Sequence, residues 1–157
     1  MSIDPHKGPS RMISQTAEYA LRAVTFLADH GEAQTAQAIA KGTRVPVGYL
    51  AKILQGLVRS GLVSSQRGLY GGFVLARAPK ELSIHDVVQA VAPITRIERC
   101  PLGIEGHGTN LCPLHRSLDN AMATVEQSFR RLTVHTLLSQ AHGSHPLCSF
   151  PRPVAPV

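Results

Sequence analysis

The stretch that decides the fold is Gly61 to Leu75, GLVSSQRGLYGGFVL. Its two ends, 62–66 and 72–75, combine apolar and small polar residues in short runs that are typical of β-strands. The segment between them, 67–71, is too long and too rich in glycine for a two-residue hairpin turn. The stretch therefore predicts a β-hairpin with a protruding tip.

The residues before this hairpin have the apolar spacing of amphipathic helices. We expect a first helix over 14–30, ended by Gly31. A short second helix is expected to be capped by Thr35, to run through Lys41 and to be stopped by Gly42. Pro46 stands where the first turn of a helix tolerates proline, so a third helix is expected over 46–60. Three helices followed by a hairpin are the order of a winged helix-turn-helix, whose third helix can lie in the major groove of DNA.

The residues after the hairpin predict two further helices separated by a loop. A capping box at Ser83–Asp86 opens a fourth helix, which Pro93 ends. A helical pattern then covers 113–138 and carries an apolar seam with heptad spacing. The seam residues are Leu118, Met122, Val125, Phe129 and Leu132. A narrow seam of this kind favours burial against a partner helix, with packing on its own domain as the alternative.

The predicted fold is mainly α with a small β-hairpin, organised as a winged helix-turn-helix plus a long C-terminal dimerisation helix. The DNA-binding domain is expected over 12–92, a sensor loop over 93–112 and the dimerisation helix over 113–140. Residues 1–11 lack periodicity and are expected to be a disordered leader. The proline-rich segment 141–157 is expected to be a disordered tail.

Composition and charge narrow the class of protein. A length of 157 residues with 43% apolar and 17% charged residues fits one soluble domain and excludes a large multidomain enzyme. Residues 11–80 hold nine Lys and Arg against three Asp and Glu, whereas residues 81–157 hold six of each. This asymmetry favours nucleic acid as the partner of the first half, with a solvated basic surface as the alternative. The sequence has neither a membrane-length apolar run nor the pattern of a signal peptide, so we expect a cytoplasmic location.

Residues suited to contact DNA gather at the start of the third helix and at the hairpin tip. Gly48 lets the helix backbone approach the bases, and Tyr49 and Lys52 follow it. Arg67 has the length and planar charge to enter a minor groove, with an exposed arginine in a flexible hairpin as the alternative. The predicted DNA-binding residues are Thr35, Gly48, Tyr49, Lys52, Arg59 and Arg67.

The sensor loop carries a different chemistry. It holds the thiols of Cys100 and Cys112 with the imidazoles of His107 and His115, which are good ligands for iron–sulfur clusters and for zinc. Two cysteines twelve residues apart are a weaker metal signal than paired C-x-x-C units, so histidines that are merely solvated are the alternative. Cys148 lies in the tail and is expected to be a free thiol.

Taken together, these residues resemble a known family, the winged-helix transcriptional regulators that include the iron–sulfur cluster regulator and the nitric-oxide-sensing nitrite repressor (IscR/NsrR type). The resemblance covers about residues 12–138 and rests on SQTAEYALRA at 14–23, VGYL with the following IL at 47–54, and GLVSS, RG and GGF within 61–73. It implies a homodimer that binds a partly palindromic operator and represses or activates nearby genes. It also supports the predicted roles of the third helix and the hairpin arginine. Ala51 departs from the cluster-regulator branch, which has an acidic residue that tunes sequence choice there.

The resemblance also implies an iron–sulfur cluster in the loop. Cluster-binding members carry three cysteines, the outer two spaced as Cys100 and Cys112 are, and one branch adds a histidine that His115 matches. Other members take a carboxylate from the first helix of the partner subunit, where Glu18 aligns. The middle cysteine is missing here, and His107 stands near its place. A mixed ligand set drawn from these five residues is therefore expected, and the small number of cysteines favours a two-iron (2Fe–2S) cluster.

Three functions from different classes compete. The first is a DNA-binding regulator that senses redox state, nitric oxide or iron–sulfur status through the cluster. The second is a DNA-binding regulator with a Cys100/Cys112 thiol–disulfide switch or with no cofactor. The third, an enzyme or interaction module, needs a convergent catalytic set. Cys112 and His115 have no evident orienting group or oxyanion site, so we expect no enzymatic activity.

Overall fold

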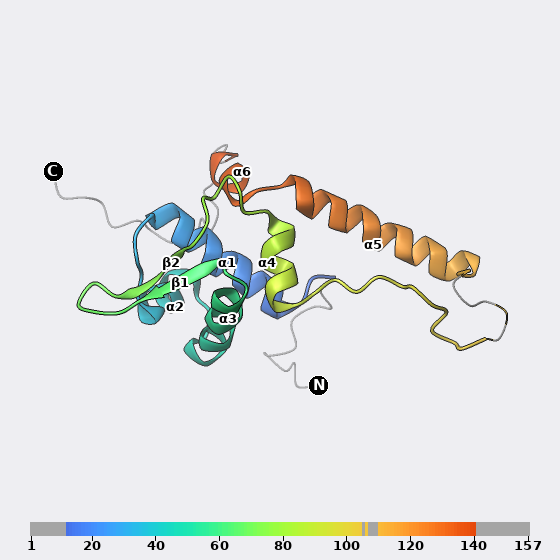
Figure 1. Cartoon of the computed structure of the whole chain (residues 1–157), viewed down its shortest axis with the longest axis horizontal. Helices are drawn as coiled ribbons and strands as arrows, with labels where there is room; N and C mark the ends of the chain where they lie inside the picture. Colours follow the sequence, from blue (N-terminus) through green and yellow to red (C-terminus); the bar gives the residue numbers. More distant parts are fainter. Residues whose placement is uncertain (1–11, 105, 107–109, 141–157) are drawn as a thin grey trace, which may run out of the picture.

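The computed structural model describes residues 12–104, 106 and 110–140. The expected leader and tail, His107 and Cys148 lie outside the described residues. The described elements are α1 (Gln15–His30), α2 (Ala36–Thr43), α3 (Val47–Arg59), β1 (Val63–Gln66), β2 (Gly72–Leu75), α4 (Ile84–Val91), α5 (Pro113–Arg131) and α6 (Val134–Ser139). The described part combines helices with one two-stranded sheet, whose hairpin projects from the helical body, so the expected mainly α fold with a β-hairpin is confirmed (Figure 1). None of the helices in the described part is long and apolar enough to cross a membrane.

Side-chain caps fix where the helices begin. The Ser14 hydroxyl accepts a hydrogen bond at the start of α1, and Gly31 ends that helix in the left-handed conformation with φ of 70°. Thr35 caps α2 as predicted, because its hydroxyl oxygen accepts from a backbone N–H three residues on. Ser83 and Asp86 form the expected capping box of α4.

The end of α2 differs from the prediction. The helix does not stop before Gly42 but continues through it, and Arg44 takes the left-handed conformation with φ of 54°. Gly42 is needed inside the helix because a Cβ atom there would overlap the ring of Phe26 on α1. Glycine at this position therefore serves close packing of two helices rather than helix termination.

The hairpin forms the wing and pairs with a third segment. β1 and β2 are antiparallel, with Val63 opposite Leu75. Phe73 and Gln34 also exchange two backbone hydrogen bonds of 2.8 and 2.9 Å, which the sequence did not predict. Gly72 permits this approach, since a Cβ atom there would meet the Gln34 carbonyl and its φ of 153° suits glycine. The wing is thus anchored to the segment before α2.

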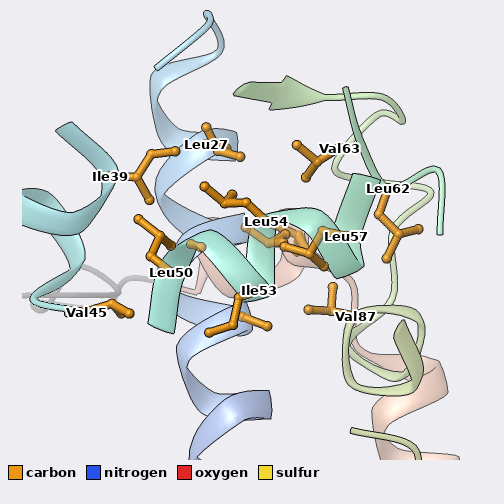
Figure 2. Close-up of a cluster of buried hydrophobic side chains, with 14 of the residues drawn as sticks. Leu27, Ile39, Val45, Leu50, Ile53, Leu54, Leu57, Leu62, Val63 and Val87 are labelled. Atoms are coloured by element: carbon orange, nitrogen blue, oxygen red, sulfur yellow. The ribbon is translucent and has the colours of Figure 1, made fainter. Parts of the chain in front are cut away.

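The core lies between α1, α2, α3, the wing and α4 (Figure 2). α3 contributes four of its buried side chains on one face, which leaves its other face to solvent. The labelled core residues are Leu27, Ile39, Val45, Leu50, Ile53, Leu54, Leu57, Leu62, Val63 and Val87. Truncating one such leucine to alanine costs about 2 to 5 kcal/mol. The core therefore holds α3 rigidly with a defined face outward.

The helix expected over 113–138 is two helices. α5 ends before Leu132, whose carbonyl accepts a 2.9 Å hydrogen bond from the Ile84 backbone N–H, and Thr133 then caps α6. This hydrogen bond requires an extended backbone at Leu132 and joins segments that are far apart in the sequence. Helical periodicity reports only on local spacing, so it did not reveal the break between the two helices. Figure 1 shows α5 extending away from the other helices as an arm.

The apolar seam is covered by its own domain only at one end. Phe129 and Leu132 pack against a second cluster that includes Val88. Towards the start of α5, Leu118 is 48% exposed and Leu114 is 63% exposed. Packing on the domain therefore accounts for the C-terminal part of the seam, and the N-terminal part is free to meet a second chain.

Candidate DNA-binding surface and thiol site

The outward face of α3 presents the residues that the sequence singled out. Val47 is 56% and Tyr49 is 59% exposed, and Gly48, Lys52 and Arg59 are exposed as well. A Cβ atom added to Gly48 would meet nothing within 4 Å. The packing of the chain itself therefore does not require glycine at this position. Close approach of the α3 backbone to another molecule would explain why glycine is present.

Aromatic contacts hold the start of α3 against α1. The rings of Tyr19 and Tyr49 meet edge to face with centroids 6.3 Å apart. The Arg22 guanidinium lies 5.4 Å from the Tyr19 ring and donates a 3.2 Å hydrogen bond to the Thr43 carbonyl. Sequence reasoning missed this arrangement because no local pattern links residues on different helices. The contacts orient Tyr49 at the leading edge of the exposed face.

Lys52, Arg59 and Thr35 carry the polar groups among the predicted DNA-binding residues of the helices. Lys52 and Arg59 line a hollow of about 260 Å³ together with Thr16 and Ala90. Thr35 is exposed at the N-terminus of α2, where its oxygen accepts a hydrogen bond and its hydroxyl hydrogen can still be donated. Donors at a helix N-terminus suit phosphate groups. The two cations and the hydroxyl are therefore all groups that can bind phosphate.

The wing tip carries Arg67 and two exposed apolar side chains. Arg67 is exposed and forms no ion pair with any of the described residues. A turn closes next to it, with a 3.0 Å hydrogen bond from the Gly71 N–H to the Gly68 carbonyl. Leu69 and Tyr70 at the corner of the turn are 92% and 88% exposed. Sequence reasoning did not single out these two side chains, although glycines on both sides marked the turn.

The thiol site consists of Cys100, Cys112 and His115. Cys112 is the N-cap residue of α5, and its sulfur lies 3.2 Å from Nδ1 of His115. The Cys100 sulfur lies 4.0 Å from the same nitrogen. All three residues are half-buried. The structure therefore brings together three of the five predicted ligands across the loop.

Of the other two predicted ligands, Glu18 lies on α1 away from this site, and the structure does not describe His107. The Glu18 carboxylate pairs with Arg22 on its own helix at 2.6 Å. Over 12–104, 106 and 110–140, no group of three or more His, Cys, Asp or Glu side chains is arranged to hold a metal ion. A complete ligand set therefore needs a donor from elsewhere and a closer approach of the three residues.

A polar network, the α5 clasp, joins the loop, α4 and α5 and was not anticipated. Its members are Arg96, Asp119, Glu126 and His85. Arg96 binds Asp119 through two 2.6 Å hydrogen bonds, which lower the pKa of Asp119 to about 2. Glu126 accepts from Arg130 at 2.7 Å and lies 3.2 Å from Nε2 of the buried His85 on α4, and the Arg130 bond leads the causes that lower the pKa of Glu126. The clasp ties the arm to the DNA-binding domain.

Comparison with known proteins places this architecture in a family. The family model described as Rrf2, iron-dependent transcriptional regulator, matches residues 13–140. The chain belongs to the Rrf2 family. It is therefore a transcriptional regulator and not an enzyme. The expected resemblance and the winged-helix fold are both confirmed.

Relatives of this Rrf2 chain cover most of its length. An HTH-type transcriptional regulator of Aquifex aeolicus is 28% identical over 132 residues, covering 82% of this chain and 92% of the relative. The protein aau3 of Rhizobium meliloti is 30% identical over 149 residues, covering 93% and 96%. Among solved structures, CymR, the global cysteine regulator of B. subtilis, is 26% identical with a TM-score of 0.69, covering 82% of this chain and 97% of that one. T. potens IscR shares the fold at 23% identity with a TM-score of 0.68, covering 85% and 90%.

Proposed function

We propose that this chain is a homodimeric regulator that binds a partly palindromic operator through α3 and the wing. The observation that carries the proposal is the outward face of α3, which is exposed, basic and opened by a glycine that the fold does not need. α3 enters the major groove with Gly48 and Tyr49 towards the bases, and Lys52 and Arg59 meet bases or phosphates. Thr35 donates to a backbone phosphate, and Arg67 enters the adjacent minor groove.

The second chain of the dimer is held along α5. The exposed start of α5 is the surface for this contact. It carries Leu118 of the apolar seam and Leu114 one turn before it, and burial of these two exposed side chains is favourable. Two copies then present two α3 helices to half-sites about 34 Å apart, one turn of B-DNA. At that spacing, small rotations of the arms change the fit to DNA.

The thiol site holds an iron–sulfur cluster, most simply of the two-iron type. Cys100 and Cys112 supply thiolates and His115 supplies an imidazole nitrogen, and the distances of 3.2 and 4.0 Å to this nitrogen support a common ligand set. Glu18 of the second subunit or His107 completes it. When bound, the cluster supplies a redox-active centre, and histidine ligation raises its potential relative to all-thiolate sites.

The residues around the thiol site connect it to the DNA-binding surface. Cys112 starts α5 and Cys100 ends the segment that leaves α4, so holding both sulfurs fixes the loop on the arm. α4 in turn packs on α3, where Gly56 faces Val91. A change of ligand at the thiol site therefore alters the position of α3 relative to α5 and, through it, the affinity for DNA.

A cluster-free thiol switch is the second candidate function. Both sulfurs lie within 4.0 Å of one nitrogen, so the separation of Cys100 and Cys112 cannot exceed the two distances combined. Disulfide formation then requires the two sulfurs to approach from within this separation to about 2 Å. This regulator would contain no iron, and reductant would control its affinity for DNA.

Protein prepared without oxygen distinguishes the two functions. We expect iron, acid-labile sulfide and visible absorbance in the wild type, and their loss in Cys100→Ala and Cys112→Ala. Cys148→Ala is the matched control and keeps the absorbance. A colourless, iron-free wild type would exclude the cluster. If its DNA affinity then changes with reductant, the thiol switch takes its place.

A further inference from the structure

The α5 clasp lies at a defined distance from the thiol site. Asp119 follows His115 by four residues, so both side chains lie on the same face of α5. From Asp119 back to Cys112 the helix rises by about 10 Å. On the loop, Cys100 follows Arg96 by four positions, and this stretch of chain spans at most about 14 Å. The loop segment is therefore long enough to place Cys100 beside Cys112 when Arg96 is held at Asp119.

The hydrogen bonds fix the position of the loop along the helix and not only its proximity. One Asp119 oxygen accepts from the Ile97 backbone N–H at 2.9 Å as well as from Arg96, and the other oxygen accepts the second Arg96 bond. A planar guanidinium bound at both oxygens has one orientation, and the backbone bond excludes a shift by one residue. The Asp119 side chain is only 15% exposed, so this pair is better protected from water than an ordinary surface ion pair.

The geometry points to a role for this contact. We propose that Arg96 and Asp119 are positioning residues of the thiol site, which hold the loop in the register that places Cys100 beside Cys112 and His115. The inference rests on the proposed function in assigning the sulfurs a common task, but it holds for a cluster or a disulfide. Glu126 and His85 extend the contact to α4, with Arg96 also 3.6 Å from Glu126.

The test measures how readily the two sulfurs meet, without any metal. In the iron-free Cys148→Ser protein, oxidised glutathione accepts two electrons from the Cys100 and Cys112 thiols. One protein disulfide forms, and two glutathione thiols are released with the two protons. The equilibrium constant is read by trapping free thiols across glutathione buffers. We expect Asp119→Ala to lower this constant by about tenfold, about 30 mV for a two-electron couple, because the loop loses its register.

Matched variants separate positioning from general stability. Arg130→Ala removes the 2.7 Å ion pair to Glu126 on the same helix but leaves the loop anchored, so its constant should stay within twofold of the wild type. Arg96→Lys keeps the charge but loses the paired geometry and should lie between wild type and Asp119→Ala. Helix content by circular dichroism verifies that each variant is folded.

The outcomes distinguish this inference from the proposed function. The positioning role is overturned if folded Asp119→Ala has the same disulfide equilibrium constant as the wild type. If Asp119→Ala does not fold, the same result in folded Arg96→Lys overturns it. An equal fall in Arg130→Ala also overturns it, since the effect would then be general. A wild-type protein without iron would exclude the cluster, but the expected change in the disulfide equilibrium constant of Asp119→Ala would still hold.

Discussion

Replacing Gly48 with alanine separates the demands of the fold from the demands of DNA. The added Cβ atom meets nothing within 4 Å, and the backbone at Gly48 is helical, so the substitution creates no strain. Alanine is favoured over glycine in a helix interior by about 1 kcal/mol. Gly48 lies in the first turn of α3, where part of this gain is expected, so we predict stabilisation by about 0.5 kcal/mol.

The same methyl group should weaken DNA binding. On the proposed surface Gly48 is where the helix backbone comes nearest the bases, and a homodimer carries the substitution in both half-sites. We predict a loss of about tenfold or more in affinity, corresponding to about 1.4 kcal/mol. Urea unfolding measures the stability, and fluorescence anisotropy with a labelled operator at fixed salt measures the affinity.

Gly42→Ala is the matched control, since it makes the same chemical change in the preceding helix. There the Cβ atom would overlap the Phe26 ring, so we expect destabilisation by about 1 to 3 kcal/mol. A Gly48→Ala protein that binds DNA as the wild type does would refute the reasoning about α3. A loss of stability in Gly48→Ala would contradict the observation that a Cβ atom at this position has open space around it.

Arg67, Asp119 and Leu57 each give one further prediction. Arg67→Ala should change the unfolding free energy by less than about 0.5 kcal/mol and lower the salt dependence of operator binding by about two counterions per dimer. Arg131→Ala, which removes an exposed arginine on α5, should change neither quantity, and an unchanged salt dependence in Arg67→Ala would argue against a contact between the wing and DNA. Folding lowers the pKa of Asp119 from 3.8 to about 2, so its ionised form stabilises the fold fully above about pH 4 and loses this effect as the pH falls towards 2. The difference in unfolding free energy between wild type and Asp119→Asn should therefore narrow as the pH falls over that range. A difference that stays constant with pH would contradict a contribution of the ion pair. Leu57→Ala, in the core under α3, should cost about 2 to 5 kcal/mol in urea unfolding, and a cost below 1 kcal/mol would contradict its complete burial.

The helices and the wing were predictable because their signals are local. Periodicity, the hydroxyl caps and the glycine-rich tip each act within a few residues, and together they gave the winged helix-turn-helix. Thr35 illustrates this, since its capping bond spans three residues of sequence. The end of α2 was misjudged because Gly42 has a packing role against Phe26 that glycine alone does not reveal.

Long-range contacts carried no such signal. The break after α5 depends on a backbone bond between Leu132 and Ile84, and the third segment of the wing depends on Gln34 and Phe73. For the thiol site, residue type made Cys100, Cys112 and His115 candidate ligands, because thiolate and imidazole bind metals well, and the family resemblance supplied their spacing. Arg96 and Asp119 were ordinary charged residues in the sequence, and only their geometry distinguishes them.

Hydroxyl-radical footprinting shows whether two copies of the chain bind DNA with α3 and the wing. Operator fragments are first selected from genomic DNA by the wild-type protein. We predict two protected blocks one helical turn apart, flanked by minor-groove protection that disappears in Arg67→Ala. A single protected block, or a pattern that Arg67→Ala leaves unchanged, would contradict it.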